Sequence, residues 1–295
     1  MNRALLRAVV ARAARSLGFT SPVVWTYLPT DTALDLVGML RGPGSVVAYY
    51  CVADFAELAS DPAGLEVSEA QMVQASDVVF AHCEELARRC ARHGREAHVF
   101  PSGVNMDAFP LSTLRASLDR GTARPVIGYV GGVHRHIDFD LLAAAARRRA
   151  DWSWVLVGPR RTSTDRLESL PNVRLVGQRP HRELAAWIAG FDVCVVPFVC
   201  SRFTETMMPT KINEYLAMGK PVVATDLAAL REFNDRHHVL SLVPTEVGPF
   251  VAAIELALSG RSAADGLERR RVAATSDWGR QLEVMSDLIA AQPVS

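Results

Sequence analysis

A lysine and a glutamate lie three residues apart at the start of one apolar segment. Residues 206–225 read TMMPTKINEYLAMGKPVVAT, in which Lys211 and Glu214 follow Pro209 closely. Proline suits the first turn of a helix, and residues at i and i+3 share a helix face. We therefore predict a helix that begins at Pro209, ends at Gly219 and leads into a short buried strand.

Two interpretations fit this charged pair. Free backbone N–H groups and the helix dipole favour an anion at a helix N-terminus. Lys211 could then neutralise a phosphate, and Glu214 could accept hydrogen bonds from sugar hydroxyls. The alternative is a surface helix with an ordinary ion pair, worth roughly 0.2–0.5 kcal/mol. This stretch alone does not decide between them.

The composition is that of a globular chain without a charge bias. Of 295 residues, 49% are apolar and 22% charged, with 32 basic and 32 acidic side chains. The length predicts two domains, and zero net charge argues against nucleic-acid binding. The sequence contains no run of 18 apolar residues, so we expect no membrane-spanning helix.

The cysteine pattern supports neither a metal site nor a disulfide framework. There are five cysteines, and no two have C-x-x-C spacing. We expect free, mostly buried thiols in a reducing compartment, and hence a cytoplasmic protein. Asp138 and Asp140 have Asp-x-Asp spacing, but they suit the start of a helix better than a metal site. We therefore expect no metal.

The first 20 residues are amphipathic and contain four arginines but no acidic residue. We favour a crossover helix of an α/β domain. A transit peptide or a helix on a membrane surface is the alternative. The membrane-surface alternative would bring peripheral contact with the inner face of a membrane.

Strands and helices are expected to alternate along two blocks of the chain. The expected strands are residues 22–29, 45–52, 77–81, 97–104, 125–132, 153–159, 172–178, 192–198, 220–226 and 238–244. Such alternation implies right-handed parallel crossovers and doubly wound sheets. The fold class is therefore α/β with two Rossmann-like domains, joined by a linker over residues 105–124.

Ligands of doubly wound sheets bind beyond the carboxyl ends of the strands, where this sequence places several glycines. Gly131 and Gly132 follow one strand directly and would allow close approach of a ligand. Arg135 is a phosphate contact or a solvated loop charge. His134 and His136 have no metal-ligand spacing, and a ligand role for either is the weaker interpretation. We expect the strand ends at residues 131, 158, 177 and 198 to meet at one cleft.

Five segments occur in an order that resembles a known enzyme family. They are PSGVN, GYVGG, WVLVGP, LPNVRLVGQRPHRELAAWIAGFDVCVVPF and PTKINEYLAMGKPVVAT. Together they resemble the retaining group 1 (family 4-like) glycosyltransferases of the GT-B fold, over about residues 97–290, with a weaker match over 22–96. The resemblance implies an acceptor-side domain over 1–107, a nucleotide-sugar domain over 108–275 and a terminal helix over 276–295 that crosses back to the first.

The resemblance implies a nucleotide diphosphate sugar, UDP- or GDP-linked, as the donor, with no other cofactor. Lys211 and Arg135 would contact the diphosphate and stabilise its charge during transfer. Glu214 would hold the ribose hydroxyls. The other implied donor contacts are Gly131 and Gly132 at the diphosphate, Gly177 and Arg179 at the nucleobase, and Thr206 and Pro209 at the sugar.

The sequence departs from the family pattern in three places. Thr206 stands where many relatives have the first glutamate of a Glu-x7-Glu motif, although a subfamily with the pattern N-P-x-K-x-x-E-Y-L-A also lacks it. Asp54 remains from a pair of aspartates, with Ala53 in the other place. It is a candidate acceptor-binding or base residue, or simply a helix N-cap. Because PSGVN comes early in the chain, we expect the first domain to be incomplete.

The implied function is sugar transfer to a carbohydrate or lipid-linked acceptor, with retention, in polysaccharide biosynthesis. The alternative is a non-catalytic nucleotide-sugar-binding or partner subunit. A nucleotide-sugar epimerase is a weaker third interpretation, because few carboxylates can be placed near the sugar. An incomplete sheet exposes an edge or an apolar face. We therefore predict marginal solubility or a homodimer, and a stable monomer in light scattering would contradict this.

Overall fold

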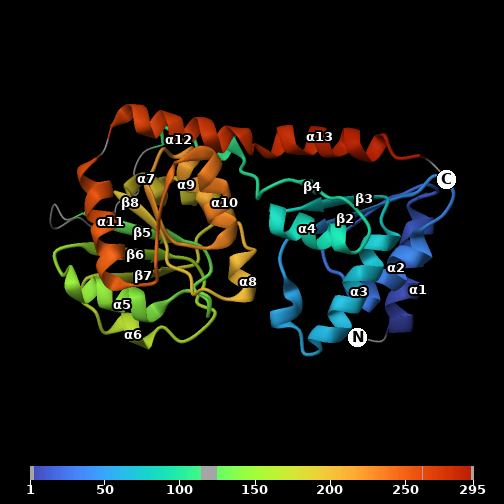
Figure 1. Cartoon of the computed structure of the whole chain (residues 1–295), viewed down its shortest axis with the longest axis horizontal. Helices are drawn as coiled ribbons and strands as arrows, with labels where there is room; N and C mark the ends of the chain where they lie inside the picture. The colour runs from blue at the N-terminus through green and yellow to red at the C-terminus, as the bar shows by residue number, and fades with distance from the viewer. Residues whose placement is uncertain (1–2, 114–124, 261, 294–295) are drawn as a thin grey trace. The chain divides into compact units, whose positions relative to one another are not determined.

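The computed structural model describes residues 3–113, 125–260 and 262–293 (Figure 1). They form two compact units, one of Met1–Pro101 with Arg280–Ser295 and the other of Ser102–Gly279. The units thus divide at 101/102 and 279/280, a few residues from the expected boundaries at 107/108 and 275/276. Of the expected linker, residues 114–124 lie outside the described part of the chain.

The first unit contains a parallel sheet with strand order β1-β2-β3-β4. Its strands are β1 (Val23–Thr26), β2 (Val46–Cys51), β3 (Val78–Ala81) and β4 (His98–Val99). Its helices are α1 (Arg3–Ser16), α2 (Asp31–Leu40), η1 (Phe55–Leu58), α3 (Pro62–Ala75) and α4 (Glu84–Arg92), and most of α13 (Trp278–Ala290) belongs to it as well. Tyr50 of β2 packs with Met285 of α13, while Tyr49 hydrogen-bonds to Glu69 of α3. Both faces of β2 are therefore covered.

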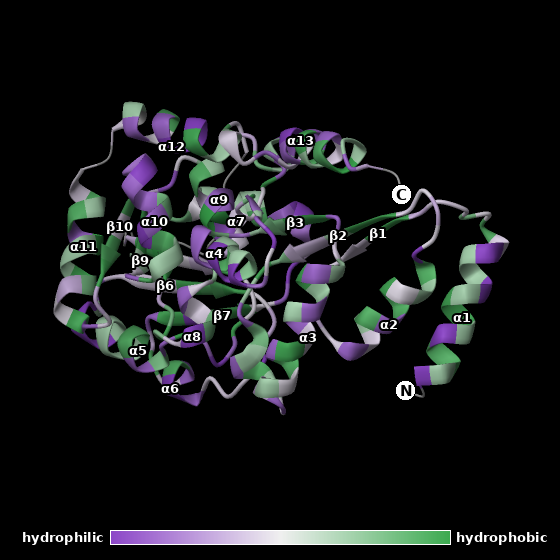
Figure 2. Ribbon diagram, turned by 45° about the vertical axis from the view of Figure 1, so that its right-hand side comes forward, coloured by the Kyte–Doolittle hydropathy of each residue, from purple (hydrophilic) through white to green (hydrophobic). Residues whose placement is uncertain are grey.

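Helix α1 contains no buried residue, and Leu5 and Val9 are each more than half exposed. Hydrophobic and hydrophilic residues alternate along it (Figure 2). Arg3 forms an ion pair with Asp35, which joins α1 to α2. Within the described ranges, no helix has the length and hydropathy needed to cross a membrane.

Arg89 of α4 connects two carboxylates in the first unit. Its guanidinium lies 2.7 Å from a carboxylate oxygen of Asp54 and 2.6 Å from one of Glu69, both of which are buried. The Tyr49 hydroxyl donates to Glu69 at 2.9 Å. Asp54 also accepts the N–H of Ala56 as the N-cap of η1. The N-cap interpretation of Asp54 therefore describes its local contacts.

The second unit contains a parallel sheet with strand order β10-β9-β8-β5-β6-β7. Its strands are β5 (Val126–Val130), β6 (Ser153–Val157), β7 (Val173–Gly177), β8 (Val193–Val196), β9 (Val222–Thr225) and β10 (Leu240–Val243). The strand order reverses between β5 and β8. In open α/β sheets, ligands bind at this switch point, beyond the carboxyl ends of the strands.

Helices of the second unit cover the sheet (Figure 1). They are η2 (Met106–Ala108), α5 (Phe139–Arg148), α6 (Asp165–Glu168), η3 (His181–Glu183), α7 (Leu184–Gly190), α8 (Arg202–Glu205), α9 (Thr210–Ala217), α10 (Ala228–His237), α11 (Val247–Ser259) and α12 (Ala263–Thr275). All residues of β5 and β8 are buried, as expected for parallel strands with helices on both faces. The predicted α/β fold with two parallel sheets is confirmed.

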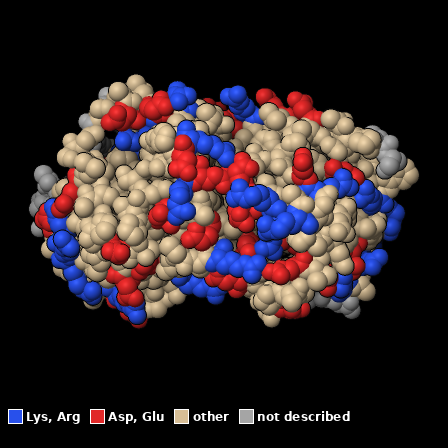
Figure 3. All heavy atoms as spheres, in the orientation of Figure 1, with Lys and Arg blue, Asp and Glu red and all other residues tan. Residues whose placement is uncertain are grey.

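Charged side chains of both signs lie on the face shown in Figure 3. This mixture agrees with the equal numbers of basic and acidic residues in the sequence.

Two neighbouring arginines of α4 allow a matched test of the first unit. We expect Arg89→Ala to lower the stability of β2 by about 3–5 kcal/mol, because it leaves two buried carboxylates unpaired. Arg88 pairs with Glu85 in an exposed ion pair, so Arg88→Ala should cost less than about 0.5 kcal/mol. Hydrogen exchange of the β2 amides measures both values. Equal effects of the two substitutions would contradict the role given to Arg89.

Candidate functional site

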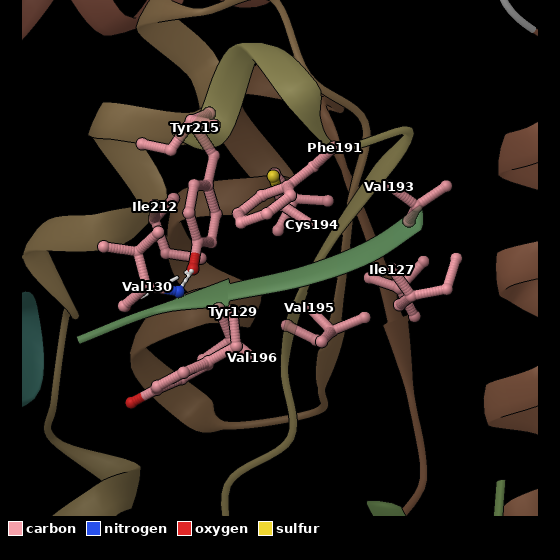
Figure 4. Packing of buried hydrophobic residues seen from close by; sticks show 14 of the residues in the cluster. Ile127, Tyr129, Val130, Phe191, Val193, Cys194, Val195, Val196, Ile212 and Tyr215 are labelled. Carbon is pink, nitrogen blue, oxygen red and sulfur yellow. Dashed lines mark hydrogen bonds between the residues drawn. The ribbon is translucent and has the colours of Figure 1, made fainter. Parts of the chain in front are cut away.

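Tyr215 attaches helix α9 to the end of β5. The backbone pairing of β5 with β8 extends only over Ile127 and Gly128. Two residues further on, the N–H of Val130 donates instead to the Tyr215 hydroxyl at 2.6 Å (Figure 4). The Tyr215 ring is fully buried, as is Ile212 on the same helix. The start of α9 is therefore held at the switch point of the sheet.

Lys211 places a buried cation at this point. Its ammonium lies 5.3 Å from the ring centroid of Tyr129 and 5.0 Å from that of Phe198, and the residue is 9% exposed. Within the part of the chain that the structure describes, the ammonium has no hydrogen-bond or ion-pair partner. Burial lowers the pKa of Lys211 to about 8, although the charge of Glu214 opposes this shift. An uncompensated buried cation is costly, and an anionic ligand would relieve the cost.

Glycines form the strand ends beside Lys211. Gly131 and Gly158 have φ values of 131° and 155°. A β-carbon on Gly158 would lie 1.8 Å from the carbonyl oxygen of Gly131, and one on Gly131 would lie 2.8 Å from Cε of Lys211. The N–H of Gly158 donates to the carbonyl of Gly177 at 2.9 Å. The ends of β5, β6 and β7 thus lie together as predicted, with bare backbone next to the lysine.

Glu214 lies near His181, which we did not predict as a site residue. One carboxylate oxygen of Glu214 is 3.7 Å from Nε2 of His181, and the His181 ring meets the Phe109 ring edge-on with centroids 5.7 Å apart. Burial raises the pKa of Glu214, while His181 and Lys211 act in the opposite direction. His181 comes four residues after Gly177, so its position just beyond a strand end was the available signal.

Arg135 and Arg179 are both exposed. Arg179 lies 5.6 Å from the ring centroid of Trp187. No contact in the described residues joins Arg135 to Lys211. Instead, the ring of the adjacent His134 lies 5.6 Å from that of Phe198, next to the lysine. The structure therefore brings together Gly131, Gly132, His134 and Lys211 and leaves Arg135 on the surface.

The segment before α9 contains Thr206 and Pro209. Pro209 is the N-cap residue of α9, one position earlier than the predicted first turn. The Thr206 hydroxyl donates to the carbonyl of Phe203 at 3.1 Å. The carboxylate of Glu205 accepts the N–H of Ala228 and so caps α10. Glu205 therefore does not replace the carboxylate that the family pattern has at position 206.

The described part of the chain contains no cluster of three or more histidine, cysteine, aspartate or glutamate residues that could hold a metal ion. Asp138 is the N-cap of α5 and accepts the N–H of Leu141 at 2.8 Å, as the sequence predicted. Cys200 is exposed, and the other cysteines are buried and free.

This chain is similar in sequence to known glycosyltransferases. Residues 124–259 match the family described as glycosyl transferases group 1. The putative teichuronic acid biosynthesis glycosyltransferase TuaH of Bacillus subtilis is 28% identical over 72% of this chain and 57% of its own length. The GDP-mannose-dependent alpha-mannosyltransferase of Mycobacterium tuberculosis is 31% identical over 52% of this chain and 39% of its own. This chain thus spans about half the length of these relatives or less.

A solved structure shows the same fold. HepE from Anabaena in complex with UDP is 16% identical and covers 97% of this chain and 82% of its own, with a TM-score of 0.73. At this identity the likeness shows the fold alone.

The contact between Gly131 and Gly158 can be tested by adding one methyl group. We expect Gly158→Ala to destabilise the second unit by at least about 3 kcal/mol, because the methyl group would overlap a backbone carbonyl. Gly248→Ala is the control, since its β-carbon would meet open space in α11 and should be neutral or stabilising by up to about 1 kcal/mol. Denaturant unfolding gives both values. A tolerated Gly158→Ala would contradict the packing described here.

Proposed function

We propose that this chain is a group 1 glycosyltransferase, the family that residues 124–259 match, and that it transfers a sugar from a nucleotide diphosphate sugar. The acceptor would be a carbohydrate or a lipid-linked sugar, and the anomeric configuration would be retained. The observation that carries the proposal is the buried ammonium of Lys211, which has no anionic partner within hydrogen-bond distance among the described residues and lies at the switch point of the sheet.

The proposed reaction needs stabilisation of a leaving anion. As the bond between the anomeric carbon and the phosphate oxygen breaks, the sugar gains oxocarbenium character and the diphosphate gains negative charge. Lys211 and the N-terminus of α9 would stabilise that charge in a site with little water. The bare backbone at Gly131 and Gly132 allows the diphosphate to approach. In this arrangement Glu214 would hold the ribose.

The donor base is proposed as uracil or guanine. The UDP complex of HepE supports the first, and the GDP-mannose dependence of the mycobacterial relative supports the second. The nucleobase would lie beside Gly177 and Arg179, at the end of β7. The relative named for teichuronic acid biosynthesis supports a role in polysaccharide biosynthesis.

One observation favours a second candidate function, nucleotide-sugar binding without turnover. The hydroxyl of Thr206 is hydrogen-bonded to the backbone, and the carboxylate of Glu205 caps α10. Neither residue then offers the donor sugar the carboxylate that many relatives have here. If the protein binds the donor and also hydrolyses it or transfers its sugar, this second function is excluded.

The two lysines of the segment give a matched pair of variants. Lys211→Met should remove nucleotide binding and stabilise the free protein by about 1–3 kcal/mol, because it removes an uncompensated buried charge. Lys220 donates to the carbonyls of Ala189 and Phe191, each at 2.8 Å. Lys220→Met should therefore destabilise the protein by about 1–3 kcal/mol and leave nucleotide affinity unchanged.

Saturation-transfer NMR and thermal melting with UDP, GDP, UDP-glucose and GDP-mannose would measure these effects. Glu214→Gln should weaken binding of the ribonucleotides without abolishing it. A wild-type protein that binds none of the four ligands would contradict the proposed function. Equal behaviour of the two lysine variants would contradict the role of Lys211.

The lowered pKa of Lys211 predicts a pH dependence. Nucleotide affinity should fall as the pH rises through about 8, by up to about tenfold per pH unit, because the ammonium loses its proton. The folding stability of the free protein should instead increase with pH. Between about pH 8 and the ordinary lysine pKa, the unfolded chain binds more protons than the folded one, so stability should rise with pH. Titration calorimetry from pH 7 to 9 tests the first effect, and Lys220→Met, which keeps Lys211, should show the same slope as the wild type.

A further inference from the structure

His134 shares an aromatic wall with Lys211. The ring of Phe198, whose centroid is 5.0 Å from the Lys211 ammonium, is 5.6 Å from the His134 ring. A β-carbon on Gly132 would lie 3.4 Å from Cδ2 of His134. The imidazole therefore covers the glycine turn at the end of β5, where the diphosphate is proposed to bind.

Backbone hydrogen bonds fix the loop that carries His134. The N–H of Val133 donates to the carbonyl of Pro159 at 2.9 Å, and the N–H of Val199 donates to the carbonyl of His136 at 2.9 Å. Ile137 also forms an antiparallel bridge with Phe198. The loop backbone is thus joined to the ends of both β6 and β8.

One backbone hydrogen bond favours a proton on Nε2 of the His134 ring. The N–H of His136 donates to Nδ1 of His134 at 3.3 Å. Nδ1 is the acceptor of this bond, which favours the neutral tautomer with its proton on Nε2. Burial lowers the pKa of His134 to about 4, helped by Lys211 and His136. At neutral pH the ring is uncharged, and its Nε2–H has no acceptor on another residue in the described ranges.

We propose that His134 is a further catalytic residue, which donates its Nε2–H to an oxygen of the leaving diphosphate beside Lys211. The inference rests on the proposed function and deepens it. When the bond to the anomeric carbon breaks, its electron pair stays on the diphosphate, and no proton leaves His134. A neutral donor adds a hydrogen bond to the developing charge without placing a second cation next to a buried ammonium.

Two substitutions separate the N–H group of His134 from its shape. His134→Phe keeps a ring against Phe198 but removes the donor, whereas His134→Gln keeps an N–H donor. We expect His134→Phe to weaken the binding of UDP or GDP by about 10- to 100-fold, which is the effect of losing a hydrogen bond to a charged group. The affinity for uridine or guanosine should not change. His134→Gln should restore most of the diphosphate affinity, and the rate of donor hydrolysis should follow the same order.

Titration calorimetry measures the affinities, and 15N NMR of the histidine rings shows the tautomer directly. The inference alone is overturned if the wild type binds UDP or GDP and His134→Phe binds them equally well. It is also overturned if the proton of the wild-type ring lies on Nδ1, a result that needs no variant. If the wild type binds no nucleoside diphosphate, the proposed function fails and the inference fails with it.

Discussion

The hydrogen bond from Val130 to the Tyr215 hydroxyl lies at the place where the larger sheet divides. Pairing between β5 and β8 ends at Gly128, so the next backbone groups of β5 need another partner. Tyr215 supplies it from a buried position on α9. The same separation of the strands makes room for the start of this helix. The strand order, the hydrogen bond and the position of Lys211 beside Gly131 are therefore consequences of one topological feature.

Two lysines nine residues apart show how surroundings decide what the same group does. Lys220 donates to two carbonyl groups at the end of α7, and thus satisfies acceptors that the helix leaves open. Lys211 faces two aromatic rings and has lost most of its hydration without gaining an anion. The first contact stabilises the fold. The second costs stability, which is the usual signature of a site shaped for a ligand rather than for folding.

Local signals in the sequence were enough to predict the α/β fold and the helix that carries Lys211 and Glu214. Alternating strands and helices and the Pro–Gly boundaries of α9 depend on neighbours in the chain. Contacts between distant loops were not predictable in this way. The approach of His181 to Glu214 depends on how two loops fold together, and so does the packing of Gly158 on the Gly131 carbonyl. The position of His134 against Phe198 likewise depends on the packing of distant loops.

Each compact unit contains a largely buried cation, but among the described residues only the one in the first unit is paired with carboxylates. In the first, Arg89 is compensated by Asp54 and Glu69, and Asp54 is further bound by the Ala56 N–H. Such a network is complete within the fold, and any use of Asp54 as a base would first require breaking these contacts. In the second, the charge of Lys211 remains without a protein anion at hydrogen-bond distance in the described residues. A buried charge that is paired within the fold indicates a structural role, whereas a buried charge without such a partner indicates a site for a ligand. By this criterion the surroundings of Lys211 fit the proposed donor site, and Asp54 has mainly architectural contacts.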